Sequence, residues 1–407
     1  MENTILLETI LQKMPYVGKW KRIFLPHLFF LFMQISGRIN FMQMGRYGTY
    51  NESTYRRNFS KPFDFYLFNK KLIKTVGSSH YVIAFDPTHI RKSGASTFGK
   101  GKFWSGCDSA MKQGLELGGF AACDIDNSTA LHLEGFQTPS LSDLKKEDKN
   151  LLAYYTELWI NNAKSFEELS VYGCVDAYFS KYHFIENVCT KTNMHIVSRL
   201  RDDAHLRYFF RGAPTGKQGR PKLYDGKVDV KNPDLNYFKL AHSDEKIRIY
   251  EATLNAKALK RTIKLALTQF INEKGEVLRT KLYFCTDLNL PAWYIVKYYQ
   301  NRFQIEFLYR DANQFTGLEQ CQARDKEKLH FHFNTALTTV SVMKAIHYLS
   351  IPKEDRKSFS MASLKVLYHN ELLLNMFFET FGINPKQHIN NPKLDQIRNF
   401  GVLNAKT

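Results

Sequence analysis

The stretch YVIAFD at residues 81–86 is rich in β-branched and aromatic side chains, and it predicts a buried strand that ends at Asp86. Two further runs, Leu115–Cys123 and Thr129–Phe136, predict two more strands. A helix (148–164), a second buried strand ending at Asp176, a helix (178–190) and a strand (194–199) are expected next. These elements decide the fold, because they set three strands joined by short turns before an alternation of strand and helix.

This order is typical of a ribonuclease H-like α/β core. After residue 200 the pattern changes to short alternating runs without a long helix, which predict an antiparallel β insertion. The core is expected to resume with one helix over residues 291–314 and a second over 329–349. The predicted fold class is therefore α/β, with a ribonuclease H-like core interrupted by a β-rich insertion and with helical regions at both ends.

Five regions follow from these patterns. They are a helical DNA-binding domain (1–75), the first part of the core (76–200), the β-rich insertion (201–285), the second part of the core (286–349) and a helical tail (350–407). The first region mixes aromatic and basic side chains between Arg46 and Arg57. This mixture suits a module that lies on DNA phosphates, and equally a solvated basic surface.

Charge is the unusual feature of the composition. The 407 residues include 57 Lys and Arg against 39 Asp and Glu, a formal net charge of +18. Such an excess favours a polyanionic partner, either nucleic acid or a membrane surface. The longest apolar run, 23–33, is far shorter than the roughly 20 residues a span needs, so no membrane association is expected. Without a secretory signal in the sequence, a cytoplasmic, nucleoid-associated location is predicted.

A polar stripe marks the expected helix near residue 300. At about 100° per residue, Tyr299, Arg302, Glu306 and Asn313 fall within an arc of about 60°, while the rest of the segment is mostly apolar. A carboxylate on such a face needs a cation as partner. That cation is either a metal ion or Arg302 itself, which forms an i,i+4 pair with Glu306.

Three acids are candidates for one site. Asp86 and Asp176 each follow an apolar strand, and if those strands are neighbours their carboxylates are too. Glu306 from a helix on the sheet would complete a set of hard oxygen ligands of the kind Mg²⁺ prefers. Two such ions can activate a nucleophilic oxygen and stabilise the leaving oxygen at a phosphodiester.

The spacing Tyr299-x-x-Arg302-x-x-x-Glu306 resembles the signature helix of DDE transposases of the IS4 type. Two strand-end aspartates upstream and a β insertion between Asp176 and Glu306 agree with that family, as does the sequence GRPK at residues 219–222. The resemblance covers roughly residues 45–345.

The resemblance implies a bacterial insertion-sequence transposase that cuts element ends and joins them to target DNA, with two Mg²⁺ ions that Mn²⁺ can replace. Asp86, Asp176 and Glu306 would be both the catalytic residues and the metal ligands. The DNA contacts would come from a further set of residues: Tyr299, Arg302, Arg310, Asn313, Arg220 and Lys222. The partners would be double-stranded DNA, as inverted repeats and target, and a second copy of the chain.

The sequence departs from the family pattern at two positions. Asn313 stands where the family has a lysine, so Arg310 could replace the missing charge, and Phe303 stands where a tryptophan is common. Relatives that form a DNA hairpin stack a flipped base on an aromatic side chain of the insertion. This insertion has no tryptophan, and the available rings are Tyr208, Phe209, Phe210, Tyr224 and Tyr237.

Two rival functions stay open. A catalytically decayed transposase would act as a sequence-specific DNA-binding protein, and the missing lysine is consistent with this. A metal-dependent nuclease would cut DNA without needing element ends.

Overall fold

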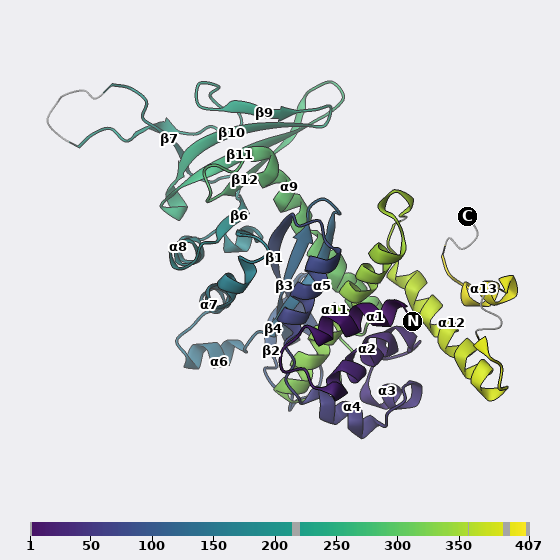
Figure 1. Ribbon diagram of the computed structural model, residues 1–407. Coiled ribbons are helices and arrows are strands. Elements are labelled where there is room, and N and C mark those ends of the chain that lie inside the picture. The colour runs from purple at the N-terminus through teal and green to yellow at the C-terminus, as the bar shows by residue number, and fades with distance from the viewer. Residues whose placement is uncertain (1, 214–219, 357, 386–390, 404–407) are drawn as a thin grey trace.

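The chain folds into a mixed α/β protein built around one large sheet (Figure 1). A computed structural model describes residues 2–213, 220–356, 358–385 and 391–403. Within these ranges the strands belong to a twelve-stranded sheet with parallel and antiparallel neighbours. The predicted α/β class is confirmed. No helix in the described ranges is long and apolar enough to cross a bilayer.

The amino-terminal region is helical, as its apolar spacing predicted. The last three helices before the sheet, α3 to α5, each begin after an asparagine or aspartate whose side chain accepts a hydrogen bond from a backbone N–H of the first turn. The helices of this region are α1 (Glu2–Gln12), α2 (Lys19–Gln34), α3 (Phe41–Tyr47), α4 (Glu52–Phe59) and α5 (Phe65–Val76).

The first part of the core follows the predicted order, with one short strand, β2, and one short helix, α6, that the sequence did not indicate. Its strands are β1 (Tyr81–Arg91), β2 (Gly101–Ser105), β3 (Ala110–Asp124), β4 (Thr129–Gln137), β5 (Tyr172–Cys174) and β6 (His195–Leu200). Its helices are α6 (Leu141–Lys146), α7 (Leu151–Phe166) and α8 (Tyr182–Lys191).

The strand order places the two aspartate-bearing strands side by side. β4 pairs with β3, β3 pairs antiparallel with β1, β1 pairs parallel with β5, and β5 pairs parallel with β6. Ile83 lies opposite Gly173 and Ala84 opposite Cys174. The three-residue strand β5 is thus held between two longer neighbours, which explains why so short a segment is ordered.

The insertion is antiparallel and extends the core sheet. Its strands are β7 (Leu206–Phe209), β8 (Tyr224–Lys227), β9 (Lys239–Ser243), β10 (Ile247–Ala256), β11 (Arg261–Ile271) and β12 (Val277–Cys285). β12 returns beside β6 and pairs with it, so that Leu282 lies opposite Leu200. In Figure 1 these strands form one end of the molecule, and the amino-terminal helices lie toward the other.

The second part of the core corrects one prediction. The expected single helix over 291–314 is two helices, α9 (Ala292–Arg302) and α10 (Gln304–Phe315), separated by a turn at Phe303. The amides of Phe303 and Glu306 each donate to a carbonyl three residues earlier, so the chain tightens there instead of continuing as an α-helix. The later helices are α11 (Lys326–Ser350), α12 (Met361–Thr380) and α13 (Pro392–Arg398).

Helices cover both faces of the core sheet. Alternate residues of β1 point to opposite sides, because side chains in a strand alternate. Ile83 and Phe85 pack in one cluster with Trp159 of α7, whereas Val82 and Ala84 pack in another with residues of α9, α10 and α11. Asp86 continues the second set, so its side chain lies on the side of α9 and α10.

The seam between β4 and α11 carries buried polar contacts. β4 pairs only with β3, so its outer backbone groups need other partners. The Asn334 side chain accepts from Gly135 N (2.8 Å) and donates to Gly135 O (3.0 Å). Ser341 Oγ accepts from His132 N, and Lys344 Nζ donates to Ala130 O. Helix side chains thus replace a missing neighbour strand.

Candidate functional site

Asp86 and Asp176 lie level with each other on neighbouring parallel strands. Each is two residues beyond the last paired position, Ala84 opposite Cys174. Asp86 does not end its strand as predicted, because β3 keeps pairing with β1 as far as Arg91. The pairing of β1 with β5 nevertheless stops two residues before Asp86, and the strands separate where the two carboxylates lie.

Asp176 is fixed by local hydrogen bonds. Its carboxylate accepts from the backbone N–H of Tyr178 (3.0 Å) and thereby caps the 3₁₀ turn Ala177–Phe179. Its main-chain carbonyl accepts from the Ser198 hydroxyl on β6 (2.9 Å). The side chain is therefore held at the edge where β5 ends.

Arg302 joins Asp86 to Glu306. Its guanidinium lies 3.4 Å from Asp86 Oδ1 and 3.2 Å from Glu306 Oε1, and its side chain is only 11% exposed. The ion pair that the i,i+4 spacing suggested is thus present, with Asp86 as an additional partner. Tyr309 of α10 donates its hydroxyl proton to the Asp86 carbonyl (2.6 Å), which ties the helix to the strand. Gly119 makes room for this ring, since a Cβ there would lie 2.3 Å from the hydroxyl.

The pKa values of the two aspartates are raised. Burial raises the pKa of Asp86 to about 7, against an attraction from Arg302 that lowers it, and the nearby Asp176 and Glu306 raise it further. Burial also raises the pKa of Asp176, with Arg302 again opposing. A group of carboxylates with a single guanidinium between them is short of positive charge.

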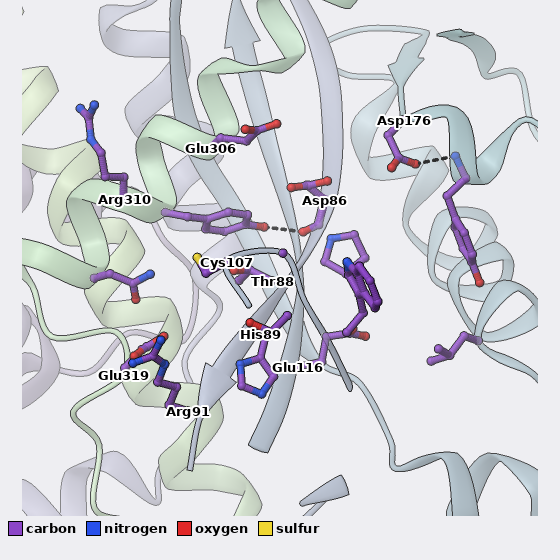
Figure 2. Close-up of a pocket in the computed structure, with 18 of the residues that line it drawn as sticks. Asp86, Thr88, His89, Arg91, Cys107, Glu116, Asp176, Glu306, Arg310 and Glu319 are labelled. Atoms are coloured by element: carbon purple, nitrogen blue, oxygen red, sulfur yellow. Dashed lines mark hydrogen bonds between the residues drawn. The ribbon is translucent and has the colours of Figure 1, made fainter. Parts of the chain in front are cut away.

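A cavity of about 1130 Å³ opens at this place. Figure 2 shows Asp86, Asp176 and Glu306 around it, with Arg310 farther along α10. Asn313 also lines the cavity, and its Oδ1 is buried without a hydrogen-bond partner among the described residues. The Nε of Arg302, which is not among the lining residues, is likewise buried without a hydrogen-bond partner in the described part of the chain. Buried polar atoms without partners are uncommon in folded proteins, and here they mark a place where a polar ligand can bind.

The acids do not form a ready-made metal cage. Among the residues that the structure describes, no three His, Cys, Asp or Glu side chains are grouped closely enough to hold an ion. The guanidinium of Arg302 instead lies between Asp86 and Glu306. The donor chemistry does suit Mg²⁺, because the cavity wall offers carboxylate oxygens from three elements of the fold.

The two predicted DNA contacts Tyr299 and Arg310 differ in their position relative to the cavity. Tyr299 does not line it, and its ring packs at a tilt against Tyr283 of β12 with centroids 4.8 Å apart. The turn at Phe303 breaks the single polar arc, so Tyr299 belongs to the junction with the insertion. Arg310 lines the cavity one turn beyond Glu306 on α10, where it pairs with Asp311 (3.0 Å) and stays about half exposed.

The predicted DNA contacts of the insertion are exposed and distant from the cavity lining. Arg220 is exposed, and Lys222 pairs with Asp225 at 2.9 Å. Gly219 lies outside the described residues. The candidate stacking rings already contact one another: Tyr208 lies on Tyr237 with centroids 4.3 Å apart.

Sequence reasoning missed two further acids that line the cavity, Glu116 and Glu319. Glu116 on β3 is 6% exposed, receives a short hydrogen bond from the Tyr155 hydroxyl and lines the same cavity. Burial raises its pKa, and its charge adds to the raised pKa of Asp86. One signal was available, because a glutamate between two leucines of a buried strand is unusual.

The basic stretch of the amino-terminal region is partly engaged within the protein. Arg56 pairs with Glu52 and lies over the Phe41 ring at 4.8 Å. Surface pairs of this kind contribute little to stability, so these contacts leave both earlier interpretations of the stretch open.

Comparison with known protein families found no family model that matches the chain, and comparison with curated proteins found no match. The functional assignment therefore depends on the geometry of the site and on the sequence motifs within it.

Proposed function

We propose that the protein is a DNA transposase of the IS4 type, which cuts the ends of an insertion sequence and joins them to target DNA by two-metal phosphoryl transfer. The observation that carries the proposal is the meeting of Asp86, Asp176 and the Arg302–Glu306 pair at one cavity. These residues come from regions 90 and 130 positions apart in the sequence, and they are the ones on which the family resemblance depends.

The strand order supports a ribonuclease H-like core. β4, β3, β1, β5 and β6 lie in this order, with β3 antiparallel to β1 and with β1, β5 and β6 parallel. In sequence order the strands of the core are therefore arranged third, second, first, fourth and fifth, if the short β2 is left aside. The acids lie where the parallel strands end, the usual position of active sites in open α/β sheets.

Asp86, Asp176 and Glu306 would hold two Mg²⁺ ions, or Mn²⁺ in their place, and the bound ions supply activation of the attacking oxygen and stabilisation of the leaving oxygen. Arg302 neutralises the acids when no other cation is near, and it must leave Asp86 before that carboxylate can serve as a ligand. The pKa of Asp86 is raised even though Arg302 lies beside it. This carboxylate would therefore take up a proton readily when no metal ion is bound.

Residues in and beside the cavity would position DNA. Arg302 has an Nε–H without an acceptor in the described structure, and the side-chain NH₂ of Asn313, at the cavity wall, can donate to a phosphate oxygen. Arg310 offers a half-exposed guanidinium on the same helix. A scissile phosphate between these groups would face the acids. Arg220, Lys222 and Tyr299 would contact DNA farther along the insertion.

The net charge of +18 supports double-stranded DNA as the partner, both as inverted repeats and as target. Pairing of two element ends calls for two protein copies, so a homodimer on DNA is part of the proposal. A cytoplasmic, nucleoid-associated location in a bacterium follows from such a substrate.

The test is cleavage of a duplex that carries the inverted repeats flanking the gene. With Mg²⁺ the parent protein should nick the repeat ends, and Glu306→Gln should lower the rate by about 10³-fold or more while it still binds the duplex. Glu327→Gln, on the exposed first turn of α11, is the matched control and should cut normally.

The results also separate the rival functions. Binding of the repeats without cutting in Mg²⁺ or Mn²⁺ indicates a decayed transposase that acts as a DNA-binding protein. Equal cutting of duplexes with and without the repeats indicates a nuclease. Unchanged cutting by Glu306→Gln contradicts the proposed site altogether.

A further inference from the structure

A second groove lies beside the catalytic cavity. It has a volume of about 720 Å³ and is bounded by the turn between β3 and β4, by α10, by the end of α11 and by the segment 353–359, of which residue 357 is not described. Arg310 lines both this groove and the catalytic cavity. The two depressions therefore meet at one guanidinium on α10.

Basic side chains converge on this groove from three elements. Arg310 comes from α10, Lys344 from α11, and Lys353 and Arg356 from the segment that follows. Lys353 is exposed. Glu354 and Asp355 are neighbours of Lys353 in the chain but do not line the groove.

The acids that line the groove already have partners. Asp311 pairs with Arg310 at 3.0 Å, and Asp126 pairs with His80 at 3.3 Å. Two of the cations instead face neutral oxygens. Lys344 Nζ donates to Ala130 O, and Arg356 donates to the carbonyls of Tyr348 and Ile351. The groove thus keeps an excess of positive charge.

Burial of Lys344 makes this excess of positive charge energetically unfavourable. It is 4% exposed, and burial lowers its pKa to about 8. Desolvation disfavours a buried ammonium unless an anion compensates for the lost water. An anionic group bound in the groove would supply that compensation.

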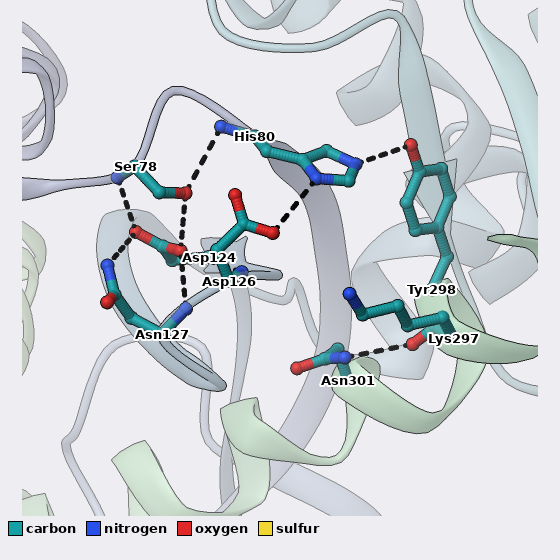
Figure 3. A network of polar contacts seen from close by, with 8 residues as sticks. All are labelled: Ser78, His80, Asp124, Asp126, Asn127, Lys297, Tyr298 and Asn301. Carbon is teal, nitrogen blue, oxygen red and sulfur yellow. Dashed lines mark hydrogen bonds and ion pairs between the residues drawn. The ribbon is translucent and has the colours of Figure 1, made fainter.

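The wall formed by the β3–β4 turn is rigid. Asp124 is fully buried and accepts hydrogen bonds from the backbone N–H groups of Ser78, Asp126 and Asn127 (Figure 3). His80 bridges Asp126 to the Tyr298 hydroxyl on α9. The turn is thereby tied to the helix that carries Arg302, so the groove and the catalytic cavity keep a fixed relation.

We propose that this groove binds the phosphate backbone of the DNA that continues past the catalytic cavity, with Arg310, Lys353 and Arg356 as its phosphate contacts. The inference rests on the proposed function, because it assigns a further part of the same DNA to a surface outside the catalytic cavity. Charge complementarity selects the ligand, since a DNA strand that leaves the acidic cavity at Arg310 continues along a groove with an excess of basic side chains.

The test measures duplex binding by Lys353→Glu and by Lys353→Glu with Arg356→Gln across a series of salt concentrations. Loss of one phosphate contact should reduce the slope of log K against log salt by about 1 and weaken binding by about tenfold near 0.1 M salt. The double variant should lose about twice that slope. Lys164→Glu is the matched control, since it makes the same charge change at an exposed position of α7.

Phosphate-ethylation interference gives the second readout. Ethylation at certain phosphates beyond the cleavage site should inhibit binding by the parent and by Lys164→Glu, but no longer by Lys353→Glu. If Lys353→Glu matches Lys164→Glu in slope and interference while the parent cuts repeat ends, the groove proposal is wrong and the proposed function stands. If the parent neither binds nor cuts the repeats, the proposed function itself fails.

Discussion

The seam between β4 and α11 and the cavity around Asp86 both bury polar side chains against the same sheet, but they differ in how those groups are paired. In the seam, the Asn334 amide meets the N–H and the carbonyl of Gly135 and also contacts His132. In the cavity, one guanidinium serves two carboxylates, its own Nε lacks a partner in the described structure, and the pKa of Asp86 is raised to about 7.

The difference separates polar groups that hold the fold from polar groups that are available to a ligand. Matched neutral partners recover most of the cost of leaving water, and such contacts stabilise the native state. Buried carboxylates that outnumber the nearby cations do not recover this cost. Such an imbalance is typical of a site where a bound ligand supplies the missing charge. Substitutions in the two regions should therefore affect different properties.

The largest expected effect is on cleavage by Asp176→Asn. An asparagine oxygen can still cap the turn at Tyr178, so the free energy of unfolding should stay nearly constant. The neutral side chain is a poor Mg²⁺ ligand, and the cleavage rate should fall by about 10³-fold, or about 4 kcal/mol in activation free energy. Cleavage assays and urea denaturation of the same preparation test both parts, and a large loss of stability would remove the contrast with the seam.

Asn334→Leu should show the opposite behaviour. The leucine has a similar size but leaves the N–H and carbonyl of Gly135 and the ring of His132 without their partner, at a cost of about 3 kcal/mol in unfolding free energy. Thr339→Val is the control, because that hydroxyl donates only to Thr335 O of its own helix. Equal losses in the two variants would show that the seam contacts carry no special stability.

The pH dependence of stability should distinguish Asp86 from a structural carboxylate. Between its ordinary pKa of 3.8 and its raised pKa of about 7, the folded state keeps a proton that the unfolded state releases, so stability falls as pH rises through this range. Asp86→Asn does not titrate. In metal-free buffer its unfolding free energy relative to the parent should therefore increase from pH 4 to pH 7 by about 2 to 4 kcal/mol. Chemical denaturation at pH 4 and pH 7 tests this, and a constant difference contradicts it.

The smallest expected effect is a gain. Asn313→Lys restores the positive charge that the family pattern has at this place of the cavity wall, and it should tighten binding of repeat DNA by about tenfold and steepen the salt dependence by about 1. Asn161→Lys adds the same charge at an exposed position of α7 and serves as control. If both variants gain equally, the effect is general attraction and Asn313 does not face a phosphate.

The sequence predicted the parts of the fold that local patterns determine. Alternating apolar runs gave the strands around Asp86 and Asp176, and apolar spacing gave the helices of the amino-terminal region. The sequence argument had to assume that β1 and β5 are neighbours, because sequence patterns do not specify which strands pair. The break at Phe303 left no local sign, since that segment contains neither proline nor glycine.

The sequence predicted which three acids lie together, but it predicted the residues around them less well. Asp86, Asp176 and Glu306 line one cavity, but Tyr299 packs against β12 because the turn at Phe303 rotates α9 relative to α10. Glu116 was missed since its carboxylate enters the cavity from β3, far from any motif. The second groove was also missed, because Arg310, Lys344 and Arg356 come together only when the two last core helices pack.

The pairing of β12 with β6 has a consequence for the engineering of the chain. The β insertion begins after β6 and ends with β12, and these two strands are neighbours with Leu200 opposite Leu282. A tight hairpin turn could therefore join its two ends. A chain closed there would keep the segments that carry Asp176 and Glu306, but α9 would lose its packing against β10 and β11. The same junction offers a splice point at which one β insertion can be exchanged for another that presents an equivalent surface to α9.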